Sequence, residues 1–243
     1  MDRGSRHTNY KMTYPTNIMK VNDYNFVDQK TAYTPNIPFK IGCTILDIDI
    51  EKLAQTCLEK EEEIMELPPS VNSDNQPLDG NTGLGPTNTT SRFSKYNVLD
   101  WNTNETNSLK KYIRENVEKY NQENKKETPE KLWVRCWVNV MRKGQSIKKH
   151  VHDIEDTCYL SCHLTVQCHE TSTIYVNPLT YYPDPHLINE KNIPRQLTIF
   201  PSFIPHYTTT HKFDKERITI AMDIKTQNFN IGNHITDQNW RII

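Results

Sequence analysis

Residues 137–152 have the sequence WVNVMRKGQSIKKHVH. Its first half is typical of a strand, Gly144 marks a turn, and two histidines follow one residue apart. Side chains at positions i and i+2 of an extended backbone point to the same face, so His150 and His152 can bind one metal ion. Neutral imidazole is a common ligand for zinc, copper and iron. The stretch is therefore either one wall of a metal site or a polar loop that holds two histidines.

The pattern around this stretch changes from helical to extended. Before residue 130, Asp49 is a plausible N-cap for a helix that starts at Ile50, and a second helix has Leu109, Ile113 and Val117 at helical spacing. After it the sequence alternates, which predicts strands at 133–140, 158–166, 173–176, 197–200 and 218–224, in addition to an earlier one at 41–48. Several short strands after two helices predict a mainly β protein of the α+β class, with helices packed on one side.

Composition excludes several classes of protein. The chain has 243 residues and a formal net charge of -1, so nothing global attracts nucleic acid or an anionic membrane. It has no apolar run of about 20 residues and no apolar core of a signal peptide in its first residues, so the expected location is the cytoplasm. Its six cysteines are expected to be reduced, and those within 158–168 lie in an alternating strand, which favours core packing over a zinc site.

Further candidate residues follow the histidine pair. His206 lies in a turn between Pro201 and the next strand, directly after Pro205. Arg217 and Thr219 share one face of that strand, while the isoleucines between and after them share the other. Because Arg offers a planar, bidentate fork, this face is suited to binding a carboxylate.

Together these motifs resemble the iron(II)- and 2-oxoglutarate-dependent oxygenases. The resemblance rests on Asn139-x-Met141-x-x-Gly144 and His150-x-His152, followed by Phe200-Pro201-Ser202, His206 and Arg217-x-Thr219. It is strongest to an oxygenase family frequent in phage and marine bacteria, and it covers about residues 133–224.

The resemblance implies a fold, a ligand set and co-substrates. It implies a double-stranded β-helix, a jelly roll related to the cupins, at 131–226. The expected single domain also has an N-terminal arm at 1–40, helical support and a long loop at 41–130, and a tail at 227–243. Fe(II) would be held by three residues, 2-oxoglutarate would contact four, and O2 would be the second co-substrate. The implied metal ligands are His150, His152 and His206, and the implied 2-oxoglutarate contacts are Arg217, Thr219, Asn139 and Met141.

Two positions depart from the wider superfamily. The usual pattern is His-x-Asp or His-x-Glu, whereas this chain has His152, with Asp153 and Glu155 as alternative carboxylate ligands. A third imidazole raises the charge of the site by one unit, which is expected to weaken Fe(II) binding or shift its potential. Met141 stands where related enzymes have Tyr, and thioether sulfur cannot donate a hydrogen bond.

The sequence supports one leading function and two alternatives. The leading hypothesis is a dioxygenase that hydroxylates a substrate and releases succinate and CO2. The alternatives are a metal-binding protein of the cupin type and a catalytically silent β-helix binding module. A protein or peptide is the first substrate class, a small metabolite the second and nucleic acid the third, with specificity expected in loops 70–96 and 181–194.

Overall fold

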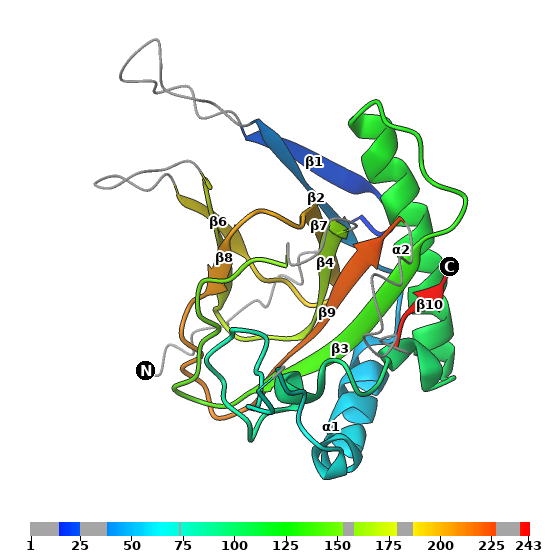
Figure 1. Ribbon diagram of the computed structural model, residues 1–243. Helices are drawn as coiled ribbons and strands as arrows, with labels where there is room; N and C mark the ends of the chain where they lie inside the picture. The colour runs from blue at the N-terminus through cyan, green and yellow to red at the C-terminus, as the bar shows by residue number, and fades with distance from the viewer. Residues whose placement is uncertain (1–14, 25–37, 73, 153–157, 179–186, 227–238) are drawn as a thin grey trace, which may run out of the picture.

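The computed structural model describes residues 15–24, 38–72, 74–152, 158–178, 187–226 and 239–243. Two helices and two short 3-10 helices accompany the strands of two antiparallel sheets (Figure 1). The helices are α1 (Ile50–Glu66), η1 (Thr89–Arg92), η2 (Val98–Asp100) and α2 (Asn104–Glu123). The strands are β1 (Met19–Tyr24), β2 (Phe39–Ile45), β3 (Trp133–Met141), β4 (Cys158–Gln167), β5 (Ser172–Val176), β6 (Leu187–Lys191), β7 (Gln196–Pro201), β8 (His206–Thr208), β9 (Arg217–Lys225) and β10 (Arg241–Ile242).

The larger sheet has the order β1-β2-β7-β4-β9-β3-β10, and the smaller has the order β6-β5-β8. Strands that are neighbours in space are mostly distant in sequence, as in a jelly roll. The mainly β architecture with flanking helices confirms the predicted fold class. Figure 1 shows α1 and α2 along one face of the larger sheet and the smaller sheet across from the other face.

Alternation along β9 separates the core from the interior of the jelly roll. Its isoleucines and Met222 pack in the main apolar cluster with Leu53 of α1 and with Leu109 and Ile113 of α2. Cys162 and Leu164 of β4 belong to the same cluster, which confirms core packing for that cysteine. The opposite face of β9 holds Arg217, Thr219, Ala221 and Asp223, which line a cavity.

The helix that starts at Ile50 has Asp49 as its N-cap, as predicted, because the Asp49 side chain accepts a hydrogen bond from the Lys52 amide. Its buried residues are Leu53, Ala54, Thr56, Cys57 and Ile64. None of the helices in the described ranges is long and apolar enough to cross a membrane.

Some strands were not expected from the sequence. Within the predicted N-terminal arm, β1 pairs with β2 over six residues of each strand, and within the predicted C-terminal tail, β10 pairs with β3. The strand expected at 41–48 ends at Ile45, because the Leu46 amide turns to the Arg195 carbonyl. Strands β6 and β8 also lack a clear alternation, since one is largely exposed and the other has only three residues.

Candidate metal centre

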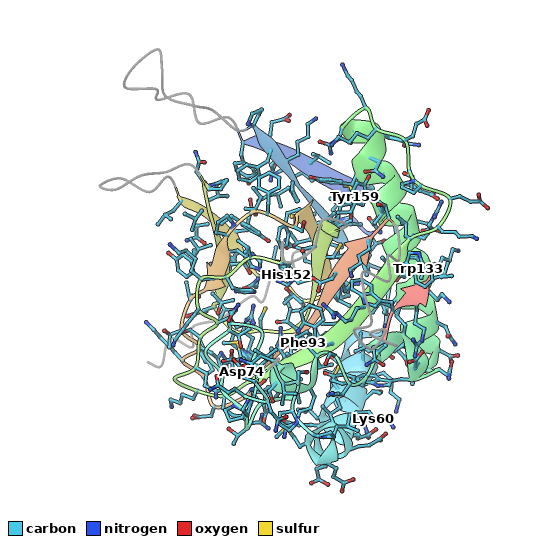
Figure 2. The ribbon with its side chains drawn as sticks, viewed as in Figure 1. Lys60, Asp74, Phe93, Trp133, His152 and Tyr159 are labelled. Atoms are coloured by element: carbon cyan, nitrogen blue, oxygen red, sulfur yellow. The ribbon has the colours of Figure 1, made fainter. Side chains whose placement is uncertain are left out.

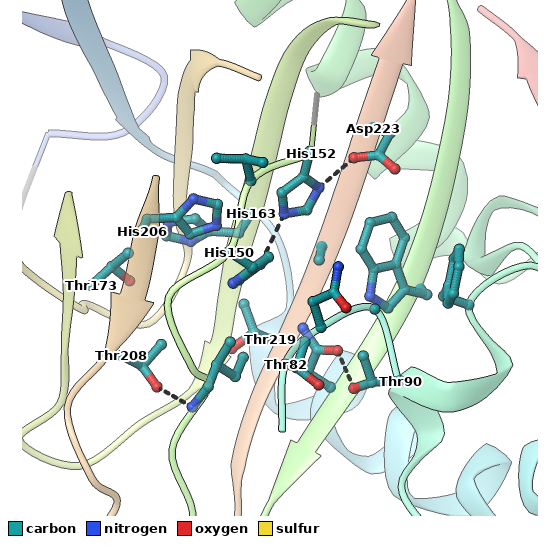
Figure 3. A pocket seen from close by; sticks show the side chains of 18 of the residues that line it. Thr82, Thr90, His150, His152, His163, Thr173, His206, Thr208, Thr219 and Asp223 are labelled. Atoms are coloured by element: carbon teal, nitrogen blue, oxygen red, sulfur yellow. Dashed lines mark hydrogen bonds and ion pairs between the residues drawn. The ribbon is translucent and has the colours of Figure 1, made fainter. Parts of the chain in front are cut away.

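A cavity of about 230 Å³ lies between the two sheets. Strands β3, β9 and β4 supply one side, β5 and β8 the other, and residues 78–82 of the long loop lie at its edge. Figure 2 shows His152 between the sheets, far from Lys60 on α1. Figure 3 shows the polar side chains that converge inside the cavity.

Three histidines meet at one end of this cavity. The ligand atoms of His150, His152 and His206 all lie within 4.8 Å of one another, and no other cluster of this kind occurs among the described residues. His206 is brought to the pair by backbone pairing, because His150 and His206 exchange two N–H···O bonds of 3.0 Å. The His152 amide bonds to the Ser202 carbonyl in the same way, at 3.2 Å. The proline-rich turn is thus attached to the His-x-His segment at two points.

Hydrogen bonds determine which nitrogen of each ring faces the centre. Nδ1 of His150 donates to the Lys148 carbonyl at 2.8 Å, and Nδ1 of His206 donates to the Ile204 carbonyl at 3.0 Å. A carbonyl can only accept, so each Nδ1 carries the proton and each Nε2 presents a lone pair when the ring is neutral. Burial lowers the pKa of His150 to about 4 and that of His206 well below its usual range, so both rings are neutral at pH 7.

His152 makes a different contact. Its Nδ1 lies 2.5 Å from Oδ1 of Asp223, whose other oxygen accepts from Arg135 Nη2 at 2.9 Å. Burial raises the pKa of Asp223, but His152 and Arg135 outweigh that effect and lower it to about 2, so the carboxylate is charged at neutral pH. Nε2 of His152 then faces Nε2 of His150 at 3.1 Å. Two ring nitrogens at that distance can share a proton, or a metal cation can take the place of that proton.

Arg217 lies at the other end of the cavity. It is 1% exposed and bonds to Thr171 Oγ1 (3.2 Å), Asn192 Oδ1 (3.3 Å) and Met141 Sδ (3.4 Å), with no carboxylate partner in the described part of the chain. Burial lowers the pKa of this guanidinium to about 10, so it is still charged at pH 7. A buried cation without a counter-ion favours binding of an anion in the cavity.

Further buried atoms that line the cavity lack hydrogen-bond partners. They are Oγ1 of Thr219, Nε1 of Trp137 and Nδ1 of His163. Such atoms are costly to bury unless a polar ligand or water satisfies them. Three convergent imidazoles, one unpaired guanidinium and these polar atoms fit a metal ion with a small dicarboxylate beside it.

The structure places the sequence-predicted residues as follows. The three histidines, Arg217, Thr219 and Asn139 all line the cavity. Asn139 Oδ1 accepts a bond of 2.5 Å from Thr90 on η1. Met141 lies behind Arg217, to which its sulfur bonds, and packs in a small buried cluster with Leu84 and Ile147. The alternative carboxylate ligands Asp153 and Glu155 lie outside the described residues.

Sequence reasoning missed several cavity residues. His163, Arg135 and Asp223 were not among the predicted site residues, although all three line the cavity. The alternation on β9 carries a signal for one of them, since Asp223 continues the face of Arg217 and Thr219. Trp137 on β3 also lines the cavity, while the Tyr175 hydroxyl bonds to His163 and the Tyr159 hydroxyl bonds to Asn121.

Residues 135–223 match the model of a family described as "Putative 2OG-Fe(II) oxygenase", where 2OG stands for 2-oxoglutarate. The match covers less than half of the chain, and this segment is similar to that family. The matched range contains the three histidines and Arg217, and the family implies Fe(II), 2-oxoglutarate and O2 as cofactor and co-substrates.

Three solved structures illustrate what the chain is similar to. A prolyl-4-hydroxylase from Pseudomonas putida has a TM-score of 0.50 and 12% identity, over 77% of this chain and 88% of that one. A non-heme monooxygenase in a nickel complex has a TM-score of 0.48 and 11% identity, over 73% and 68%. A prolyl hydroxylase from Trichoplax adhaerens in complex with a hypoxia inducible factor peptide has a TM-score of 0.42 and 12% identity, over 70% and 79%. No curated protein matches the chain.

Proposed function

We propose that the protein is a hydroxylase that couples the decarboxylation of 2-oxoglutarate to oxidation of a peptide side chain or a small molecule. The observation that carries this proposal is the set of imidazole and guanidinium groups that line one cavity. The ring nitrogens of three histidines lie within 4.8 Å of one another, and a buried guanidinium that has no carboxylate partner among the described residues lines the same cavity. The cupin-type alternative and the silent module give no role to that guanidinium.

His150, His152 and His206 would hold Fe(II), which would supply the redox chemistry that activates O2. Arg217 would bind the distal carboxylate of 2-oxoglutarate, and the Thr219 hydroxyl, which has no partner, would donate a second hydrogen bond to it. Asn139, oriented by Thr90, would contact the same molecule from β3. These contacts would hold the co-substrate between the guanidinium and the histidines.

The substrate would approach along the edge of the cavity formed by Leu78, Phe93 and Val151. These side chains are apolar, and the arginine beside them is paired with Asp223. The cavity of about 230 Å³ is below the roughly 300–1,000 Å³ of pockets that enclose drug-sized ligands. A space of this size favours entry of one uncharged side chain, so a protein or peptide ranks ahead of a small metabolite, and nucleic acid ranks third.

Succinate formation tests the proposal. Protein loaded anaerobically with Fe(II) is mixed with 2-oxoglutarate, ascorbate and O2, and succinate is measured against a His206→Ala variant prepared in the same way. We expect slow succinate release in wild type even without substrate, and none above background in the variant. Metal binding without any succinate, even in the presence of a peptide mixture, would support the cupin-type protein or the silent module instead.

A further inference from the structure

The three candidate ligands differ in what fixes their outer nitrogen. Nδ1 of His150 and of His206 each donates to a neutral backbone carbonyl two residues away in sequence. Nδ1 of His152 instead contacts the carboxylate of Asp223, 71 positions away in sequence. Only one of the three rings is therefore connected to a negative charge.

That carboxylate is held on both of its oxygens. Asp223 bonds to His152 through Oδ1 and to Arg135 through Oδ2, and the side chains of Asp223 and Arg135 are each 7% exposed. Arg135 in turn lies over the rings of Phe93 and Trp240, at 5.0 and 4.7 Å from their centroids. Contacts with buried side chains, and not with water, thus hold the Asp223 carboxylate in place.

The ring of His152 is also held by stacking. Trp137 lies against it with centroids 5.7 Å apart and planes at 24°, and His206 stacks on it at 5.2 Å and 19°. Figure 3 shows the resulting line from Asp223 through His152 to His150. The contact with Asp223 consequently sets both the tautomer and the direction of the Nε2 lone pair.

We propose that Asp223 is a positioning residue that supplies, through the His152 ring, the negative charge that a carboxylate ligand provides in other sites of this class. The inference rests on the proposed metal centre. A hydrogen bond from Nδ1 to a carboxylate makes Nε2 more electron-rich, so the His152 and Asp223 pair acts as one anionic donor. In a cavity screened from water, a charge one imidazole ring away still stabilises a divalent cation.

Asp223→Asn separates this role from simple ring positioning. Asparagine has the same size and keeps an oxygen that can accept from His152, but it removes the charge. Co(II) affinity is measured by anaerobic titration, and the Fe(III)/Fe(II) midpoint potential is measured on the iron-loaded protein. We expect Co(II) affinity to fall by about 10- to 100-fold and the midpoint potential to rise, because loss of negative charge disfavours Fe(III) more than Fe(II). An affinity within about 2-fold of wild type and an unchanged potential would overturn the inference.

Two further variants complete the experiment. Asp214→Asn removes an exposed carboxylate paired with Lys143, so both readouts should stay at wild-type values. Asp223→Asn combined with Arg135→Gln removes both buried charges and leaves the net charge unchanged. Because the lost carboxylate is the charge in contact with His152, we expect Co(II) affinity to fall in this variant too, but by less, and it provides the measurement if the single variant does not fold. Failure of wild type to bind Co(II) would contradict the metal centre itself, whereas equal binding by wild type and the folded variants would contradict only the part assigned to Asp223.

Discussion

Arg217 is the residue on which co-substrate binding depends in the proposed site. Its guanidinium bonds to a hydroxyl, an amide oxygen and a thioether, and none of these is charged. A bound carboxylate would be its first anionic partner among the described residues, in a setting where charge-assisted hydrogen bonds are strong.

Arg217→Met tests this dependence, since Met occupies much of the same volume without charge. We expect the Kd for 2-oxoglutarate, measured by anaerobic titration of metal-loaded protein, to rise at least about 30-fold, which corresponds to about 2 kcal/mol. Arg217→Lys should fall between wild type and Arg217→Met, because it keeps the charge and loses the planar fork. The control is Arg142→Met, which breaks an exposed ion pair with Glu61 and should leave Kd unchanged. Equal Kd values for all variants would exclude Arg217 from the site.

His163 connects the cavity to the hydroxyl of Tyr175, 2.9 Å from its Nε2. Burial is the main cause that lowers the pKa of His163 to about 3, and the charge of Arg217 acts in the same direction. An unfolded chain has a histidine pKa near 6.5, so between these values the unfolded state binds a proton that the folded state does not. The neutral ring therefore makes its full contribution to the free energy of unfolding above pH 6.5, and this contribution is lost as the pH falls toward 3.

The pH dependence of unfolding tests this assignment. The measurement uses metal-free protein with chelator present. Between pH 6 and 4 we expect unfolding of His163→Gln to take up about one proton fewer than wild type. The slope of the unfolding free energy against pH should therefore be smaller by roughly 1.4 kcal/mol per pH unit. Tyr175→Phe is the matched control, because it removes the hydroxyl but leaves the titrating ring, so its slope should match wild type. Parallel curves for wild type and His163→Gln would show that His163 is not held neutral by the fold.

At the scale of elements, the short helix η1 lies along the edge of β3 and supports the cavity wall there. Asn88 caps η1 through the Thr90 amide (3.1 Å) and donates from Nδ2 to the Val140 carbonyl (2.7 Å). Thr89 donates to the Val138 carbonyl at 2.7 Å, so η1 follows the edge of the strand that carries Asn139. The long loop is thereby part of the wall rather than a separate excursion.

Asn88→Ala should remove the hydrogen bonds by which Asn88 caps η1 and connects it to β3. Loss of the cap and of the buried bond to β3 is expected to lower the free energy of unfolding in urea by about 2 kcal/mol. Asn107→Ala, on the exposed face of α2, should change it by less than about 0.5 kcal/mol. A loss no larger than that of Asn107→Ala would mean that η1 contributes little to the wall.

At the scale of the whole molecule, the candidate metal centre lies between the two sheets and contacts both. His206 begins β8 of the smaller sheet, while Asp223 on β9 of the larger sheet holds His152. A cation bound by these rings requires both sheets to be folded, and none of the ligands is preassembled in the unfolded chain. Metal binding and global stability should therefore be coupled.

Thermal unfolding measures this coupling. At a free Co(II) concentration about 100 times its Kd, the folded state should gain about 2.7 kcal/mol, which raises Tm by roughly 5–10 °C. A chelator should reverse the rise, and His206→Ala should show little of it. A Tm that does not depend on Co(II) concentration would contradict a metal site between the sheets.

Local patterns were enough to predict much of the fold. The N-cap Asp49, the helical spacing of Leu109 and Ile113, and the alternation along β3 and β9 depend on neighbours within a few residues, so periodicity and capping determine them. The same logic put His150 beside His152 and Arg217 beside Thr219. The strands β1, β6, β8 and β10 were missed because they are short or exposed, and their pairing with distant strands determines them.

By itself the sequence thus determined the type of fold, through hydrophobic periods, and the candidate ligands of each segment, through i and i+2 spacing. Only the tertiary structure decided which segments meet. His150 pairs with His206, which is distant in sequence, and Asp223 contacts His152 across 71 positions. Both contacts depend on strand register and on closing long loops between the sheets. The physical reason is that side-chain periodicity is a local property of the backbone, whereas these contacts arise only when both sheets pack around one cavity.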